Sequence, residues 1–125
     1  MPRVGYAAGI AMYPGGCRDY AKEVVVRPLL LLIGGSDDWT PPQYCREMAA
    51  NMKALGADLT LVEYAGAYHY FDVVGQRKEV LADIEQPFTP GKFGVTVAYD
   101  SAAADDAHRR VEAFLARVLK GAPAR

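Results

Sequence analysis

Acidic residues and a histidine follow two successive apolar segments of this chain. Asp37 and Asp38 come after Leu29–Ile33 and a glycine pair, in LLLLIGGSDDW, and His69 follows the next apolar segment, in YAGAYHYFD. A carboxylate that accepts the proton of one imidazole nitrogen fixes the tautomer, and it stabilises the imidazolium when the other nitrogen takes up a proton. These residue types therefore predict a carboxylate–imidazole pair that transfers protons.

The same residue types also occur in structural roles and in binding sites. An aspartate after a strand commonly caps a turn or a helix, and a lone histidine near a strand end is usually structural. A site for a hard cation would draw on the side chains of Asp37, Asp38, His69 and Asp72. Such a site would contain a single histidine, and we expect neither a metal nor another cofactor. A phosphate site at residues 34–36 would lack both the G-x-G-x-x-G pattern and the lysine of a P-loop.

The residues around the acidic pair follow a strand–helix–strand pattern. Leu29–Ile33 has five consecutive aliphatic residues, which is typical of a strand covered on both faces in a parallel sheet. Pro41–Leu55 is predicted to be a helix capped by Thr40, and a second strand is predicted over Asp58–Tyr64. A right-handed crossover of this length joins parallel neighbours. The loops that carry the acidic pair and the histidine would then meet at the same edge, where open parallel sheets bind ligands.

Further elements complete an α/β fold of about three parallel strands with flanking helices, in a single domain of residues 1–125. Tyr6–Tyr13 predicts a short buried strand that ends in a Pro-Gly-Gly turn, and Val24–Val26 is expected to pack locally in a loop. The connection over residues 72–98 has no predicted strand or helix, which is unusual for a compact domain. Ser101–Lys120 predicts a helix whose buried stripe contains Val111, Phe114, Leu115, Val118 and Leu119.

The composition argues against several classes of function. The 125 residues carry a net charge of −1 and 51% are hydrophobic, so neither nucleic acid nor an anionic membrane is favoured as a partner. No apolar run reaches the ~18 residues of a membrane span. The N-terminal segment has no signal-peptide pattern. We expect a cytoplasmic protein on this basis, although composition alone leaves its location open.

The two cysteines, Cys17 and Cys45, form neither a C-x-x-C motif nor a Cys/His cluster, which argues against zinc. A single disulfide between them stays open at this stage. If Cys17 were instead a free thiol close to His69, it would be partly ionised and nucleophilic, and it is therefore a candidate nucleophile. Cys45, in the first turns of the predicted helix, is expected to be a small packed side chain.

RPLLLLIGGSDDWTPPQYC followed by VEYAGAYHYFDV resembles the C-terminal part of the dienelactone hydrolase family, within the α/β-hydrolase fold. The family pattern is an apolar strand, Gly-x-x-Asp, a helix that starts with proline, another strand and a Gly-Ala-x-His-x-Phe segment. Residues 34–37 and 66–71 match the two motifs, and YDSAAADDAHRRVEAFLARVL resembles the family's final helix. The resemblance extends from AGIAMYPGG to near the end of the chain.

The resemblance implies roles for individual residues. Asp37 would be the acid of a catalytic triad and His69 its general base, with Asp38 only a second candidate for the acid. Trp39, Tyr70 and Phe71, together with Asp38, would help to shape a pocket for a small-molecule ester or lactone, although each ring also fits simple packing.

The nucleophile of such a triad is not recognisable. The chain contains neither Gly-x-Ser-x-Gly nor Gly-x-Cys-x-Gly, the elbow that precedes the acid in these hydrolases. We therefore expect this chain to be the last third of a hydrolase domain, without the first strands and the elbow. On its own it is expected to be inactive as a carboxylic ester or lactone hydrolase. The alternative is a non-catalytic α/β fragment that assembles with a partner. In either case the cut sheet edge predicts a homo-oligomer or a complementing N-terminal segment.

Overall fold

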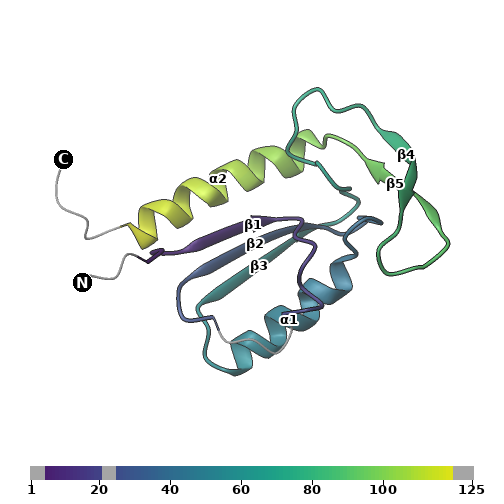
Figure 1. Ribbon diagram of the computed structural model, residues 1–125. Helices are drawn as coiled ribbons and strands as arrows, with labels where there is room; N and C mark the ends of the chain where they lie inside the picture. The colour runs from purple at the N-terminus through teal and green to yellow at the C-terminus, as the bar shows by residue number, and fades with distance from the viewer. Residues whose placement is uncertain (1–4, 21–24, 120–125) are drawn as a thin grey trace.

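The structure is a computed structural model that describes residues 5–20 and 25–119. Three parallel strands form a sheet in the order β1-β2-β3, and an antiparallel hairpin, β4-β5, forms a second small sheet (Figure 1). The elements in chain order are β1 (Gly9–Met12), β2 (Leu29–Gly34), α1 (Pro42–Ala54), β3 (Leu59–Tyr64), β4 (Glu79–Glu85), β5 (Phe93–Val97) and α2 (Ser101–Val118). The predicted α/β class and its three parallel strands are confirmed.

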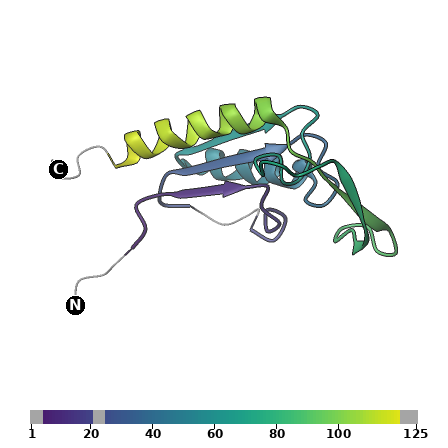
Figure 2. The same cartoon turned by 90° about the horizontal axis from the view of Figure 1, so that it is seen from above.

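The sheet lies between the two helices, with α1 on one face and α2 on the other (Figures 1 and 2). Side chains of β2 alternate between the two cores, because successive residues of a strand point to opposite faces. Leu31 and Ile33 pack with the α1 residue Met48, whereas Leu30 and Leu32 pack on the α2 side. This double burial explains why β2 is continuously aliphatic, as predicted.

The start of α1 differs from the prediction. Pro41 is its N-cap residue and no side chain caps the helix. The hydroxyl of Thr40, which was predicted to cap α1, instead contacts Asp37 and the carbonyl oxygen of Tyr13. The residue after the C-cap, Gly56, has a φ of +90°, which suits a glycine at this position.

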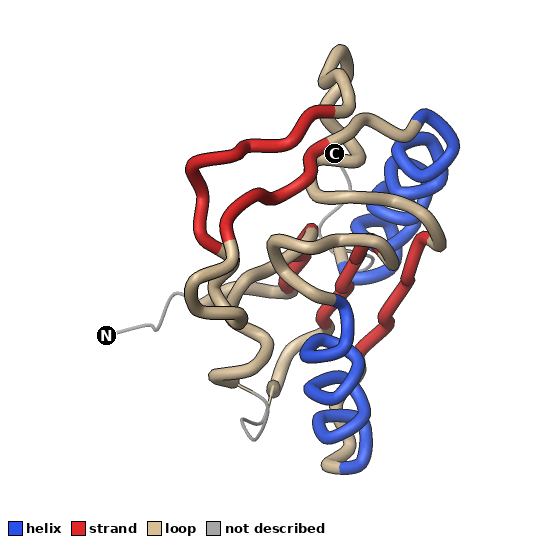
Figure 3. The backbone as a smooth tube through the Cα atoms, turned by 90° about the vertical axis from the view of Figure 1, so that its right-hand side faces the viewer, coloured by secondary structure: helices blue, strands red, loops and turns tan. Residues whose placement is uncertain are grey.

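The long connection after His69 contains the β4-β5 hairpin, which the sequence did not predict. Strand β4 is mostly exposed and the pairing shifts register between Leu81 and Glu85, so β4 lacks a regular apolar alternation. Strand β5, in contrast, buries Val95 and Val97. Figure 1 shows the hairpin projecting beyond the carboxyl ends of the parallel strands, and Figure 3 shows its two strands side by side in red. The hairpin is therefore a neighbour of the loops that carry the predicted site.

The buried stripe of α2 starts earlier than predicted and leaves out two of the predicted leucines. Phe114 is buried and Val111 and Val118 are partly buried, but Leu115 and Leu119 are 40% and 46% exposed. Two alanines nearer the start of the helix, Ala103 and Ala107, fill the core instead. The predicted stripe does not include these alanines, because small side chains give a weaker hydrophobic pattern than large apolar ones. The expected end of the helix at Lys120 lies outside the described residues.

The loop prediction at Val24–Val26 is only partly supported. Val25 packs against the core on the α1 side, Val26 is 83% exposed, and Val24 lies outside the described residues. Neither α1 nor α2 has the length and hydrophobicity that a bilayer crossing requires, and the described ranges contain no other helix.

Candidate active site

The loops after β2 and β3 are joined at the carboxyl edge of the sheet. The N–H of Ser36 donates to the carbonyl oxygen of Ala67, and the N–H of Gly35 donates to that of Tyr64. A Cβ on Gly34 would lie 2.5 Å from the Ala67 oxygen. The absence of a side chain at Gly34 is therefore what allows the acid-bearing and base-bearing loops to approach each other.

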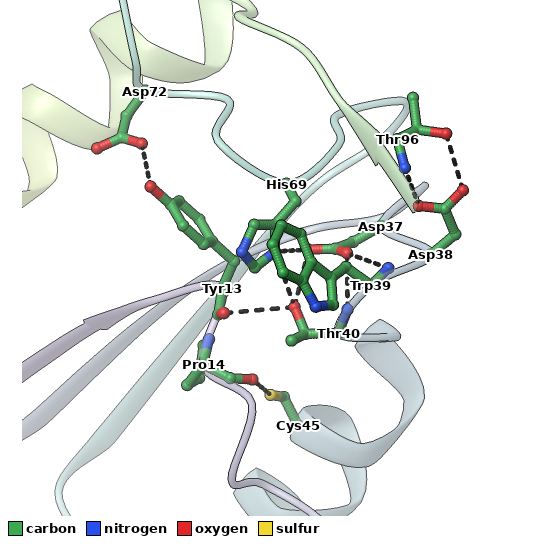
Figure 4. A network of polar contacts seen from close by, with 10 residues as sticks. All are labelled: Tyr13, Pro14, Asp37, Asp38, Trp39, Thr40, Cys45, His69, Asp72 and Thr96. Atoms are coloured by element: carbon green, nitrogen blue, oxygen red, sulfur yellow. Dashed lines mark hydrogen bonds and ion pairs between the residues drawn. The ribbon is translucent and has the colours of Figure 1, made fainter. Parts of the chain in front are cut away.

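Asp37 and His69 meet across this contact. The Asp37 Oδ2 and the His69 Nδ1 are 2.9 Å apart, although the residues are 32 positions apart in the sequence (Figure 4). Both residues are buried, with 4% of Asp37 and 8% of His69 exposed. The sequence-based expectation that two neighbouring strand ends bring these side chains together therefore agrees with the geometry.

The carboxylate of Asp37 has several further donors. Its Oδ1 accepts hydrogen bonds from the backbone N–H groups of Trp39 and Thr40, each at 2.8 Å. Its Oδ2 accepts from the Thr40 hydroxyl at 2.9 Å. An ionised carboxylate has acceptor sites for all of these donors and for the imidazole. The turn after β2 thus fixes the orientation of Asp37 before any substrate is present.

The imidazole of His69 is oriented through Nδ1. Because the facing carboxylate only accepts, Nδ1 carries the proton and donates it to Asp37, which leaves Nε2 with a lone pair. Nε2 makes no hydrogen bond with a described residue, and within that part of the chain no fully buried side-chain nitrogen or oxygen lacks a partner. Nε2 is therefore reached by solvent and can accept a proton from an incoming group.

Aromatic rings surround the imidazole. The ring centroids of Tyr13, Trp39 and Tyr70 lie 4.3, 4.7 and 4.9 Å from that of His69. Two of the residues predicted to shape the site, Trp39 and Tyr70, thus contact the base directly. The third, Phe71, is fully buried in the core on the α2 side. The Phe71 ring packs against the Tyr13 ring, with centroids 5.4 Å apart, and has no exposed surface that could line a pocket.

Tyr13 is a site residue that the sequence reasoning missed. It follows β1 with a φ of +39°, and its hydroxyl donates to Asp72 Oδ1 at 2.7 Å. Burial raises the pKa of the Tyr13 hydroxyl well above its usual range, and the hydrogen bond to Asp72 raises it further. The signal that could have found it was its place at the end of a strand of the sheet, the position that also identified Asp37 and His69.

Asp38 points away from the imidazole. Its two carboxylate oxygens accept from the backbone N–H and the hydroxyl of Thr96, at 2.7 and 2.8 Å (Figure 4). Adjacent aspartates therefore contact different partners, with Asp37 on the base and Asp38 on strand β5 of the hairpin.

Cys17 forms a disulfide with Cys45, and both residues are buried. A disulfide sulfur is not a thiolate, so this form of the chain does not support Cys17 as a nucleophile. The bridge connects the turn after β1 to α1, and the Cys45 sulfur lies 3.9 Å from the Pro14 carbonyl oxygen. Cys45 is packed in the core on the α1 side, as expected, and it is one half of the disulfide that the sequence left open.

The acidic residues around the histidine do not form a metal site. Throughout residues 5–20 and 25–119, no three His, Cys, Asp or Glu side chains are grouped so that they could hold a metal ion. Asp37 and Asp38 diverge, and Asp72 receives the tyrosine hydroxyl. The alternative of a hard-cation site therefore lacks the necessary geometry.

Comparison with known proteins gives a family match over almost the whole chain. The model of the dienelactone hydrolase family matches residues 4–119. No curated protein matches the sequence.

Solved structures of an esterase from the planctomycete Thermogutta terrifontis have a similar fold. Its native form has a TM-score of 0.53 and 22% identity, over 78% of this chain and 27% of its own. A propionate-bound form has a TM-score of 0.55 and 22% identity, over 83% and 30%. A form described as phosphoramylated by tabun has a TM-score of 0.54 and 20% identity, over 82% and 31%. This chain thus has the fold of part of an α/β-hydrolase and spans less than a third of these relatives.

Proposed function

This chain belongs to the dienelactone hydrolase family, and on that premise we propose that it carries the acid and the base of a hydrolase acting on carboxylic esters or lactones. Asp37 is the acid, His69 is the general base, and the substrate is a small molecule. The observation that supports this most directly is the buried contact of 2.9 Å between Asp37 Oδ2 and His69 Nδ1.

The proposed chemistry is acyl transfer. His69 Nε2 takes the proton from the hydroxyl or thiol of a nucleophile as that group attacks the ester carbonyl. Asp37 stabilises the resulting imidazolium through Nδ1. His69 then returns the proton to the leaving alkoxide, and a water molecule activated in the same way releases the acid from the acyl-enzyme. Trp39 and Tyr70 border the imidazole and are the proposed contacts for the substrate.

We further propose that the nucleophile comes from polypeptide outside these 125 residues. The sequence contains no Gly-x-Ser-x-Gly or Gly-x-Cys-x-Gly elbow, and Cys17 is in a disulfide. The chain spans only 27–31% of the length of the Thermogutta esterase structures. The 125 residues alone would then hydrolyse activated esters no faster than buffer.

The test measures hydrolysis of p-nitrophenyl acetate by the complete polypeptide or assembly that contains this sequence, isolated from its source through an epitope tag. His69→Ala should lower kcat/KM by about 10²–10⁴, and Asp37→Asn by about 10⁴, as loss of the orienting acid does in a triad. The control is His108→Ala, because His108 is an exposed residue on α2 paired with Glu112. Wild-type turnover in His69→Ala, or no turnover by the whole assembly, would overturn the proposal.

A fluorophosphonate probe tests the origin of the nucleophile separately. The Thermogutta esterase is described as phosphonylated by sarin, so reagents of this class are suitable. Mass spectrometry should locate the label outside the 125 residues, and His69→Ala should slow the labelling. A label on a residue within this chain, such as Ser36, would contradict the proposed division.

A second candidate function is assembly without catalysis, and the free edge of β1 favours it. Within the described ranges β1 pairs only with β2, and Ile10 on β1 is 37% exposed. A mainly apolar pocket of about 510 Å³ lies at the amino ends of β1 and β2, with Tyr6, Ala8, Ile10, Val25, Pro28 and Leu29 among its lining residues. An unpaired edge of this kind can bind another strand, from a complementing segment or from a second copy of the chain.

Light scattering after gel filtration tests this candidate. The chain should elute as a species larger than 13.6 kDa, and Ile10→Lys should weaken the association. The control is Val74→Lys, since Val74 is 82% exposed but lies away from the pocket. A stable monomer that binds no N-terminal segment of a related hydrolase would exclude assembly as the function.

A further inference from the structure

We propose that Tyr13 is a positioning residue for His69, and that its hydrogen bond to Asp72 keeps the imidazole in the orientation that general-base chemistry requires. This inference rests on the proposed role of His69. It assigns a role to Tyr13 and Asp72, which are not part of the Asp37–His69 contact.

Polar contacts fix both the backbone and the side chain of Tyr13. Its N–H donates to the Leu32 carbonyl oxygen at 2.8 Å, which continues the β1-β2 ladder by one residue. Its carbonyl oxygen lies 3.3 Å from the Thr40 hydroxyl, which shares its single proton with the closer Asp37 Oδ2. The Tyr13 hydroxyl donates to Asp72 Oδ1 at 2.7 Å. The Tyr13 ring is therefore held in place relative to both β2 and the segment that follows His69.

This fixed ring lies against the imidazole. The centroids of Tyr13 and His69 are 4.3 Å apart with an interplanar angle of 62°, an edge-to-face contact of the kind aromatic pairs prefer. In Figure 4 the tyrosine ring stands beside the imidazole, with its hydroxyl directed to Asp72. At this separation the Tyr13 ring restricts rotation of the imidazole about its Cβ–Cγ bond.

His69 needs such a contact because hydrogen bonds restrain only one edge of its ring. Nδ1 faces Asp37 at 2.9 Å and the Thr40 hydroxyl at 3.2 Å, whereas Nε2 makes no hydrogen bond with a described residue. A half-turn of the ring would place the Cδ2 side toward the carboxylate and remove the basic nitrogen from its working position. Packing by Tyr13 and Trp39 is what opposes this rotation.

Asp72 and His69 belong to the same short segment after β3. Tyr70, between them, has a φ of +68°, and the turn is closed by the N–H of Val73 donating to the Tyr70 carbonyl oxygen. The bond from Tyr13 to Asp72 thus connects the end of β1 to the turn that starts at the base. A tyrosine hydroxyl is a proton donor throughout the neutral range, and burial and Asp72 raise the pKa of Tyr13 further.

The test uses NMR of the imidazole in the intact chain and needs no turnover. Tyr13→Phe retains the ring but removes the donor, so the Nδ1–H proton of His69 should exchange with water about tenfold faster, equivalent to about 1.4 kcal/mol of easier opening. The ring ¹⁵N shifts should report a larger share of the Nε2–H tautomer. Asp72→Ala should reproduce both changes, and the double variant should add little to either.

A matched control is present in the same molecule. The hydroxyl of Tyr64 donates to Asp106 at 2.8 Å, its pKa is raised by burial as that of Tyr13 is, and its ring has no contact with the imidazole. Tyr64→Phe should cost comparable stability to unfolding but leave the His69 signals unchanged. The only other histidine, His108, is exposed and serves as an internal reference for solvent exchange.

The outcomes separate this inference from the proposed function. Unchanged His69 exchange and tautomer in Tyr13→Phe would overturn the positioning role, whatever the esterase assay gives. The same changes in Tyr64→Phe and Tyr13→Phe would also overturn it, because they would reflect a general loss of stability. An absence of ester turnover would remove the proposed reaction but leave the orientation of the imidazole by Tyr13 measurable.

Discussion

Asp38 accepts two hydrogen bonds from Thr96, one from its backbone N–H at 2.7 Å and one from its hydroxyl at 2.8 Å. The contact joins the turn after β2 to a hairpin strand 58 positions further along the chain. It lies beside the acid–base pair without being part of it. The two adjacent aspartates can therefore be tested separately.

Asp38→Ala should loosen the hairpin. It leaves the Thr96 N–H and hydroxyl without their acceptor, which costs roughly 1–3 kcal/mol where such donors are buried. Hydrogen exchange of the β4 and β5 amides should accelerate, whereas the Nδ1–H of His69 should respond much less. Asp83→Ala, an exposed change on β4, serves as the control. Equal exchange of the hairpin amides in both variants would show that Asp38 does not anchor the hairpin.

Gly34→Ala should destabilise the chain. The new Cβ would lie 2.5 Å from the Ala67 carbonyl oxygen, which is a backbone atom and cannot turn away as a flexible side chain could. Forcing the two loops apart is expected to cost roughly 1–3 kcal/mol, as overpacking does. Urea unfolding measures this, with Gly5→Ala as the control because a Cβ at Gly5 meets no atom within 4 Å. Equal unfolding midpoints for the two variants would contradict the close contact between the loops.

Reduction of the Cys17–Cys45 disulfide should lower stability. The cysteines are 28 positions apart, and closing a loop of that length stabilises the folded state by about 3–4 kcal/mol in the chain-entropy model. The melting temperature should fall on addition of a phosphine reductant. Cys17→Ser/Cys45→Ser should melt at the lower temperature and be insensitive to the reductant. A double variant as stable as the oxidised chain would mean that the bridge contributes nothing.

Alkaline pH should destabilise the chain through its two tyrosine–aspartate pairs. Burial, followed by the bonds to Asp72 and Asp106, raises the pKa of Tyr13 and Tyr64 above the ordinary value near 10. The unfolded chain then loses these protons first, so stability is full below pH 10 and declines as pH rises from there through the folded pKa. Tyr64→Phe should show a shallower decline of the urea midpoint between about pH 9 and 11.5. An unaltered slope would contradict this linkage.

The sequence predicted the elements whose signals are local. β2 is a run of aliphatic residues because helices cover both its faces, and the crossover through α1 places Asp37 and His69 at one edge. These features follow from periodicity and handedness alone. The family resemblance then selected Asp37 over Asp38, which local pattern could not do.

The features that were missed depend on contacts between distant residues. Thr40 has the chemistry of a helix cap, but its hydroxyl contacts Asp37 and the Tyr13 carbonyl oxygen instead. Strand β5 of the hairpin buries Val95 and Val97, but β4 is mostly exposed and shows no regular alternation. The bonds from Thr96 to Asp38 join residues too far apart for a local pattern to indicate them. Tyr13 lies at the end of a predicted strand, and the residues near it in the sequence do not indicate its contact with the imidazole.

The close contact between the two loops at Gly34 has a consequence for how this protein could change during evolution. Both catalytic candidates reside in one stretch of about forty residues whose two ends are bonded backbone to backbone. Such a stretch can be inherited, duplicated or recombined as a unit that keeps the Asp37–His69 contact, whereas the contact of Tyr13 with the imidazole also requires β1. The nucleophile, and the pocket walls other than Trp39 and Tyr70, are then free to diversify in other parts of the polypeptide.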